Sequence, residues 1–236
     1  MYLLAYDTET TDLPLFKEPS DDPRQPHIVQ LGAKLIDLGT REVVHALDVI
    51  IRPNGWKSGP EALAAHGITE EYADKVGVSE ELAVSMLMQM WDVANLRVAH
   101  NEAFDCRIVR IALKRYPDIG VDPDAWKDGA AICTAKMAEP IMNMAPTEKM
   151  VKAGRNYAKK PKLTEAYKHF TGKELEGAHR AMVDVDGCLA VYFAIQGDRL
   201  PTDVAEGARA PADPLTLARS PGVTKPSGPA VDVGDF

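Results

Sequence analysis

The stretch Tyr2-Leu-Leu-Ala-Tyr-Asp-Thr-Glu9 decides the fold, because five successive apolar residues end in two carboxylates spaced by one residue. An apolar run without polar alternation is typical of a strand that is covered on both faces, in the middle of a sheet flanked by helices. Side chains alternate faces along a strand, so Asp7 and Glu9 point to the same side, roughly 6.5 to 7 Å apart along the chain. Two such anions repel, and a bound cation relieves the repulsion; all-oxygen ligands favour Mg²⁺ or Mn²⁺ over Zn²⁺. The alternative is a strand that runs into an acidic turn.

Length and composition limit the class of protein. The 236 residues fit one sizeable domain, or one domain with a tail, and 45% hydrophobic with 26% charged residues is ordinary for a soluble globular chain. The net charge of −8 argues against a general nucleic-acid coat protein, but it leaves room for an enzyme that touches nucleic acid over a small patch. Cys106, Cys133 and Cys188 are few and far apart, which favours a reduced, cytoplasmic protein. No window approaches 18 consecutive apolar residues, so we expect no membrane segment.

Strand and helix patterns alternate along most of the chain, which predicts a βαβ arrangement. Further strands are expected at 27–36, 42–52, 96–100 and 130–135, and helices at 61–65, from 79, from 101, at 162–170 and at 179–195. Residues 10–26, rich in Pro and Asp, are expected to form a loop beside the first strand. From residue 197 to 236 the chain holds six Pro and five Gly in 40 residues, so we predict a disordered Pro/Gly/Ala-rich tail.

Two more acids and a histidine extend the carboxylate pair. Asp105 and Asp184 lie where a strand passes into a helix or where a late helix returns to the sheet. His179 precedes Asp184 by little more than one helical turn, so both face one pocket if His179 lies at a frayed helix start. Four carboxylates around two cations roughly 3.5 to 4 Å apart suit phosphoryl transfer, with a neutral histidine as proton acceptor.

Two neighbouring residues compete for these roles. His100 is an alternative base, although a histidine at a strand end usually packs against the sheet. Asp186 lies two residues beyond Asp184, which rotates it by about 200° on a helix, so we expect it to face elsewhere.

Three motifs carry a family resemblance: Asp7-Thr-Glu-Thr-Thr11, Asn101-x-x-Phe104-Asp105 and His179-Arg-Ala-x-x-Asp184. In their order and approximate spacing they resemble the exonuclease motifs of the DEDDh family of 3′→5′ exonucleases, over about residues 1–196. The family includes the proofreading subunit of the bacterial replicative polymerase, ribonuclease T and oligoribonuclease. The segments 28–33 and 66–69 also look like the second strand and a usual turn of that family. The resemblance implies an α/β, ribonuclease-H-like fold for an exonuclease domain over 1–196: a five-stranded mixed sheet, its first three strands antiparallel, with helices on both faces.

The resemblance also implies the roles of residues. The metal ligands would be Asp7, Glu9, Asp105 and Asp184, holding two Mg²⁺ or Mn²⁺, with His179 as general base. Arg180 stands where the sister branch has Tyr, which indicates the histidine branch. Asp12 replaces a frequent Gly and Gln30 a frequent Glu. Candidate substrate contacts are Thr8 and Thr10 through their backbone amides, His66, Asn101, Phe104, Lys159 and Lys160; Phe104 and His66 have packing and turn-capping roles as alternatives.

The basic patch from 149 to 162 holds six bases and no acid, namely Lys149, Lys152, Arg155, Lys159, Lys160 and Lys162. It suits sequence-independent contact with substrate phosphates, and its alternative is a solvated loop. The tail offers two faint peptide resemblances, 213–217 to sliding-clamp ligands and 232–236 to the tips of single-stranded-DNA-binding proteins.

The expected function is a metal-dependent 3′→5′ exonuclease that releases nucleoside monophosphates from single-stranded or frayed 3′ ends, with DNA favoured over RNA. Three alternatives stay open: an exoribonuclease of the same fold, a polymerase-bound accessory module whose role is docking, and a small-molecule phosphohydrolase on another fold. The last would leave the Asn101-x-x-Phe104-Asp105 motif unexplained.

Overall fold

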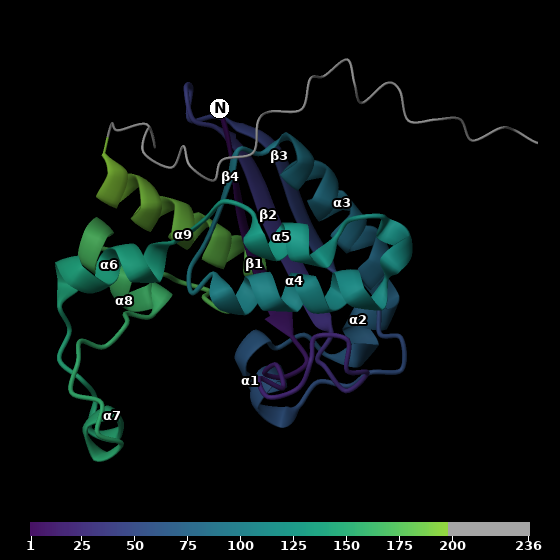
Figure 1. Ribbon diagram of the computed structural model, residues 1–236, viewed down its shortest axis with the longest axis horizontal. Helices are drawn as coiled ribbons and strands as arrows, with labels where there is room; N and C mark the ends of the chain where they lie inside the picture. The colour runs from purple at the N-terminus through teal and green to yellow at the C-terminus, as the bar shows by residue number, and fades with distance from the viewer. Residues whose placement is uncertain (198–236) are drawn as a thin grey trace, which may run out of the picture.

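The computed structural model describes residues 1–197, and a five-stranded sheet forms its centre (Figure 1). The strands are β1 (Tyr2–Thr10), β2 (Ile28–Asp37), β3 (Val43–Ile50), β4 (Leu96–Ala99) and β5 (Ala131–Cys133), in the order β3-β2-β1-β4-β5. β1, β2 and β3 pair antiparallel, whereas β4 runs parallel to β1 and β5 parallel to β4. The predicted mixed sheet is therefore confirmed, with the apolar N-terminal strand at its middle.

The helices of the described part are these: α1 (Pro60–His66), α2 (Glu70–Val76), α3 (Glu80–Val93), α4 (Ala103–Arg115), α5 (Pro123–Asp128), α6 (Thr134–Met142), α7 (Glu148–Lys152), α8 (Leu163–Thr171) and α9 (Ala181–Gln196), with a 3₁₀ turn η1 at Pro117–Ile119.

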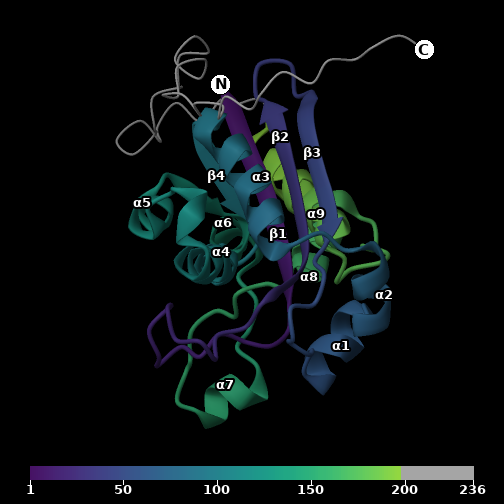
Figure 2. The same ribbon diagram turned by 90° about the vertical axis from the view of Figure 1, so that its right-hand side faces the viewer.

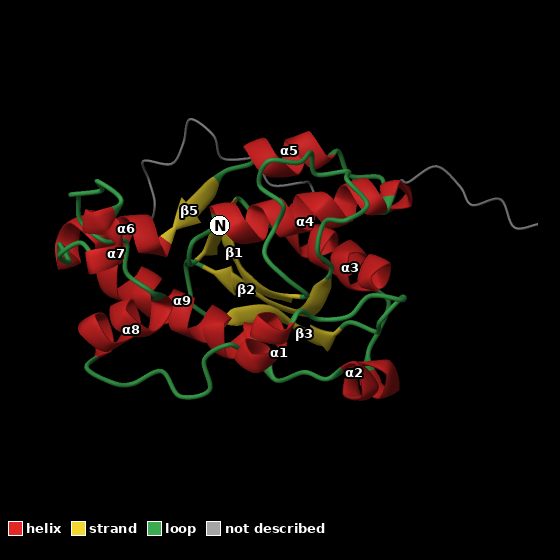
Figure 3. Ribbon diagram, turned by 90° about the horizontal axis from the view of Figure 1, so that it is seen from below, coloured by secondary structure: helices red, strands yellow, loops and turns green. Residues whose placement is uncertain are grey.

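Helices cover both faces of the sheet, as Figure 3 shows from below. Leu4 and Tyr6 of β1 pack in one core with α3 and α4, and neither side chain is exposed. Leu3 and Ala5, which point the opposite way, pack in a second core with α9. This alternation explains the unbroken apolar run at the N-terminus, since each successive side chain enters a different core.

Several boundaries differ from the sequence-based expectation. The strand expected at 130–135 is only β5, three residues long, and the helix expected from His179 begins two residues later, at Ala181. His179 has a φ of 69°, which no α-helix accommodates, so it belongs to the preceding turn. The short helices α2, α5 and α7 were not expected, because a helix of five to seven residues contains too few turns to show a periodic pattern.

The predicted tail and its two peptide resemblances lie outside the described residues, apart from Gly197, which follows α9. None of the helices within 1–197 is long and apolar enough to cross a membrane.

Candidate active site

Four carboxylates meet where β1 ends. Asp7 and Glu9 lie on β1, Asp105 lies in the first turn of α4, and Asp184 lies in the first turn of α9. Asp105 is hydrogen-bonded to Thr8, which stands between Asp7 and Glu9 on β1, and carboxylate oxygens of Glu9 and Asp184 lie within 4.8 Å of each other, so helices from opposite faces of the sheet bring their acids to one strand end. Figure 2 shows α1 and α7 at this same end of the sheet, on either side of it. The structure thus brings the four predicted carboxylates together, and their role as metal ligands stays a prediction.

Asp105 is fixed by its neighbour on β1. Its Oδ1 accepts two hydrogen bonds from Thr8, one from the backbone N–H at 3.1 Å and one from the hydroxyl at 2.8 Å. Asp105 is only 3% exposed. These contacts revise the predicted role of Thr8, because the amide expected to face the nucleotide donates to Asp105 instead. Thr8 therefore positions the Asp105 carboxylate.

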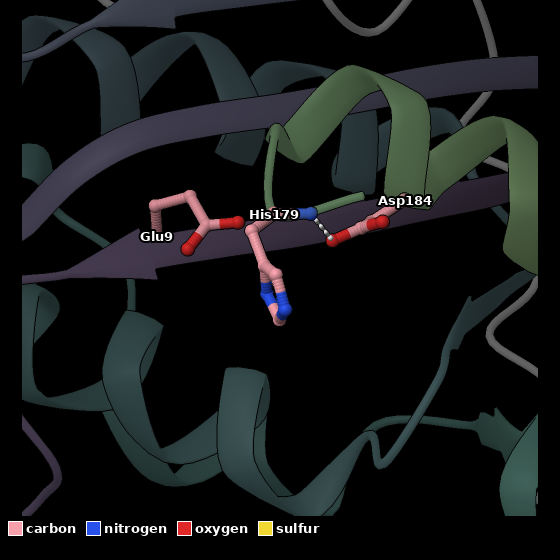
Figure 4. A group of neighbouring side chains, drawn as sticks. All are labelled: Glu9, His179 and Asp184. Carbon is pink, nitrogen blue, oxygen red and sulfur yellow. Dashed lines mark hydrogen bonds between the residues drawn. The ribbon is translucent and has the colours of Figure 1, made fainter. Parts of the chain in front are cut away.

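His179 approaches the site from a strained turn. Its backbone N–H donates to Asp184 Oδ2 at 3.1 Å, as Figure 4 shows, while its ring stays exposed. Ligand atoms of Glu9, His179 and Asp184 all lie within 4.8 Å of one another. The second oxygen of Asp184, Oδ1, is buried with no hydrogen-bond partner among the described residues. A buried carboxylate oxygen without a partner costs free energy unless something supplies positive charge.

The pKa values of the four carboxylic acids also show that the site lacks positive charge. Burial raises the pKa of Asp7 well above its ordinary value, and repulsion from Asp105, Asp184 and Glu9 adds to it. Burial, followed by repulsion from Asp184, raises the pKa of Glu9 to about 7. For Asp105, burial outweighs the two Thr8 hydrogen bonds and raises the pKa to about 8. The pKa of Asp184 is also raised by burial, against the opposing His179 contact.

The donor set fits divalent cations. Within residues 1–197, no lysine or arginine forms an ion pair with any of the four carboxylates. Four clustered carboxylate groups with an orphaned oxygen suit hard cations such as Mg²⁺ or Mn²⁺, which prefer oxygen ligands.

A cavity of about 250 Å³ adjoins Glu9 and is lined in part by Thr10, His66 and Phe104. His66 is 6% exposed; its Nδ1 accepts from the N–H of Ile68 at 2.9 Å, and its Nε2 has no partner among the described residues. Burial lowers the pKa of His66, so the neutral ring with its proton on Nε2 is favoured. Phe104 lines this cavity and also packs against the α3/α4 core, so the predicted packing role is present, and contact with a nucleotide stays a prediction.

The two lysines of the basic patch have different surroundings. Lys159 is ion-paired with Glu165, which also accepts from the backbone N–H of Lys162 at the start of α8. Lys160 is exposed, and its Nζ lies 3.4 Å from Oδ1 of Asn101, which precedes α4. The structure therefore separates a lysine that contacts a helix start from one that contacts Asn101 of the second motif.

The competing residues take other roles. His100 contacts Thr134 Oγ1 at 2.9 Å and the carbonyl oxygen of Pro161 at 3.1 Å, so it packs at the strand end as expected. Asp186 is ion-paired with Lys34 of β2 and is not part of the cluster. Sequence reasoning noted Gln30 only as a departure from a family pattern, yet Gln30 contacts the first residue of α9. The signal available was its position: Gln30 pairs with Glu9 across the strands.

Comparison with known proteins gives a family. A model of the exonuclease family named for ribonuclease T matches residues 4–192. The chain belongs to this exonuclease family. No curated protein matches it significantly.

Solved structures agree in fold with this exonuclease-family chain. Escherichia coli exonuclease I in complex with a dT13 oligonucleotide is similar with a TM-score of 0.62 and 19% identity, over 84% of this chain and 41% of that one. A moderately thermophilic exonuclease I from Methylocaldum szegediense has a TM-score of 0.62 and 20% identity, over 85% and 41%. A zinc-bound E. coli exonuclease I complex with single-stranded DNA has a TM-score of 0.58 and 20% identity, over 83% and 40%. The chain thus spans about two fifths of these relatives, 40% to 41% of their length.

Proposed function

We propose that this protein is a metal-dependent 3′→5′ exonuclease that removes nucleoside monophosphates from single-stranded DNA ends. The observation that carries the proposal is the convergence of Asp7, Glu9, Asp105 and Asp184 at one strand end without a protein cation among the described residues. Support for DNA comes from the similar fold of exonuclease I, solved with single-stranded oligonucleotides. An accessory role limited to docking gives no physical reason for four converging anions, which cost stability.

The proposed mechanism assigns a task to each group. Asp7, Glu9, Asp105 and Asp184 would hold two Mg²⁺ or Mn²⁺, which when bound lower the pKa of water and neutralise charge on phosphate and leaving oxygen. His179 would accept the proton of the attacking water, since its exposed ring lies beside Glu9 and Asp184. Thr8 would keep Asp105 oriented through its two hydrogen bonds.

The cavity beside Glu9 is the proposed site of the terminal nucleotide. The neutral His66 offers an Nε2–H donor there, and Thr10 and Phe104 supply the neighbouring walls. A buried donor that lacks a protein partner favours a polar atom of the ligand. The position of Asn101 next to Lys160 makes these two the proposed contacts for the phosphate that follows.

The different partners of Lys159 and Lys160 allow the proposed phosphate contact to be tested with two variants. We expect Lys160→Ala to raise the KM for long oligonucleotides a few-fold and to reduce its dependence on salt, because one phosphate contact is lost. Lys159→Ala should instead lower the melting temperature by loosening the Glu165 contact, with a smaller effect on KM. A dinucleotide substrate is the control. Equal loss on dinucleotide and long strand would reject the phosphate contact.

The function itself is tested by following 5′-labelled single-stranded DNA and RNA in Mg²⁺ or in EDTA, with wild type and His179→Ala. We expect DNA to shorten stepwise from the 3′ end in Mg²⁺ only, and His179→Ala to slow this by about 10²-fold or more. Fragments that shorten from the 5′ end, or unchanged DNA with pure wild-type protein, would reject the proposal. Faster shortening of RNA would reassign the substrate.

A further inference from the structure

Gln30 connects three elements next to the carboxylate site. It lies on β2 directly opposite Glu9 of β1, and only 8% of it is exposed. Its Nε2 donates to Asp48 Oδ1 of β3 at 2.8 Å, and its Oε1 accepts from the backbone N–H of Ala181 at 3.3 Å. The Asp48 contact fixes which end of the amide faces α9, because a carboxylate accepts only from the NH₂ group.

The contact with Ala181 depends on a close approach of helix and strand. Ala181 is fully buried, and a Cβ on Gly32 of β2 would lie 2.7 Å from its carbonyl carbon. Glycine at this position therefore lets the first residue of α9 rest directly on β2. His179 lies in the turn that leads into α9, two residues before Ala181.

The turn needs external support, because its own backbone is strained. His179 has a positive φ of 69°, and a histidine in this region is held there only by surrounding contacts. Two such contacts are present: the N–H of His179 binds Asp184, and the N–H of Ala181 binds Gln30.

We propose that Gln30 and Asp48 form a latch that positions His179 over the carboxylate site; this rests on the proposed role of His179 as general base. Gln30 is a positioning residue and does not touch the reacting atoms. A glutamate in its place would set a carboxylate against Asp48, so the amide and Asp48 are a matched pair. The latch acts on the orientation of the base and not on substrate affinity.

The test is a double-mutant cycle on kcat with single-stranded DNA in saturating Mg²⁺. We expect Gln30→Ala to lower kcat roughly tenfold with KM nearly unchanged. In the His179→Ala background, Gln30→Ala should cause no further loss, because the group it positions is already gone. The control is Lys34→Met. This variant removes the Lys34–Asp186 ion pair, a second contact between β2 and α9 that lies further from His179 along both elements. We expect it to leave kcat unchanged.

A charge swap gives an independent test on folded protein. Gln30→Glu should lower kcat through repulsion from Asp48. The double variant Gln30→Glu/Asp48→Asn should restore most of it, because the amide introduced on β3 can donate a hydrogen bond to the carboxylate introduced on β2. Circular dichroism melts of each variant are the control for folding at the assay temperature.

The outcomes separate the latch from the function on which it rests. A full further loss from Gln30→Ala in the His179→Ala background, or no rescue of Gln30→Glu by Asp48→Asn, overturns the latch alone. A His179→Ala enzyme with unchanged kcat overturns the base assignment, and the latch with it.

Discussion

Two buried carboxylates in this molecule, Asp105 and Glu80, are almost equally covered and behave in opposite ways. Asp105 is 3% exposed and Glu80 is 4% exposed. Burial raises the pKa of both, but at Asp105 it prevails and the pKa reaches about 8. At Glu80 a hydrogen bond from His27 and the charge of Arg115 outweigh burial, so the pKa falls below its ordinary value.

The difference lies in the partners. Glu80 contacts His27 Nδ1 at 2.7 Å and accepts from Tyr116 Oη at 3.0 Å, Arg115 Nη1 at 3.2 Å and the N–H of Ile28 at 2.9 Å. The described partner of Asp105 is Thr8, and its charged neighbours include the acids Glu102 and Glu9. The buried carboxylate of Glu80 is thus balanced by basic side chains, whereas the four clustered carboxylates have no basic partner among the described residues. A cluster of anions without positive partners favours the binding of a cation from solution.

The largest effect should follow from removing a site anion. We expect Asp105→Asn to lower kcat by about 10³-fold in Mg²⁺, because a ligand that balances metal charge is lost. At about pH 8.5, above the pKa of about 8 for Asp105, the same change should raise the melting temperature of the metal-free protein, since it removes a repelling buried charge. Activity and metal-free melting are measured on the same sample, and a metal-free protein that is destabilised by Asp105→Asn would contradict the idea of an unsatisfied site.

Glu80 should show the reverse pattern. Glu80→Ala leaves Arg115 and the Ile28 N–H without their acceptor, so we expect the free energy of unfolding to fall by about 3 kcal/mol. Below its lowered melting temperature the enzyme should keep kcat within about twofold, because the described hydrogen-bond partners of Glu80 do not include any of the four site carboxylates or His179. Urea denaturation gives the first value and single-stranded DNA digestion the second. A large loss of kcat in folded Glu80→Ala protein would remove the contrast between the two anions.

The sequence showed the active-site strand, the order of the motifs and the mixed sheet, because these follow from local apolar patterns and short spacings. It also placed Asp186 away from the site from helical geometry alone, and Lys34 confirms this. Contacts between distant segments were not visible. Thr8 was expected to face the nucleotide, and the 97-residue separation of its partner Asp105 hides that bond from any local pattern.

The basic patch and the start of α9 show the same limit. Six bases close together in sequence suggest one surface, although only the folded chain separates Lys159, held by Glu165, from Lys160 beside Asn101. His179 was expected at the frayed start of a helix, whereas it lies in the preceding turn with a positive φ, and its N–H donates to Asp184. Long-range hydrogen bonds decide such details, and a single sequence does not encode them in a readable form.

The smallest effect, and the sharpest comparison of the two anions, is the pH dependence of stability without metal. Glu9 and Asp105 have folded pKa values of about 7 and about 8, above the unfolded value of about 4, so the folded site holds more protons than the unfolded chain between these limits. Its contribution to stability is full below about pH 4 and is lost as the pH rises through 7 to 8. Glu80 has a lowered pKa, so its contribution is present above about pH 4.5 and is lost as the pH falls.

In EDTA, we therefore expect Glu9→Gln/Asp105→Asn to gain about 5 °C in melting temperature over wild type at about pH 8.5 and much less at about pH 5. Glu80→Gln should lose most against wild type at neutral pH and least in acid. Saturating Mg²⁺ should remove the alkaline difference, because bound metal replaces the protons that the wild-type carboxylates otherwise retain. An equal gain in melting temperature of the double variant at both pH values would mean that the pKa values of Glu9 and Asp105 are not raised in the folded protein. The carboxylate cluster would then not be a site that lacks a cation.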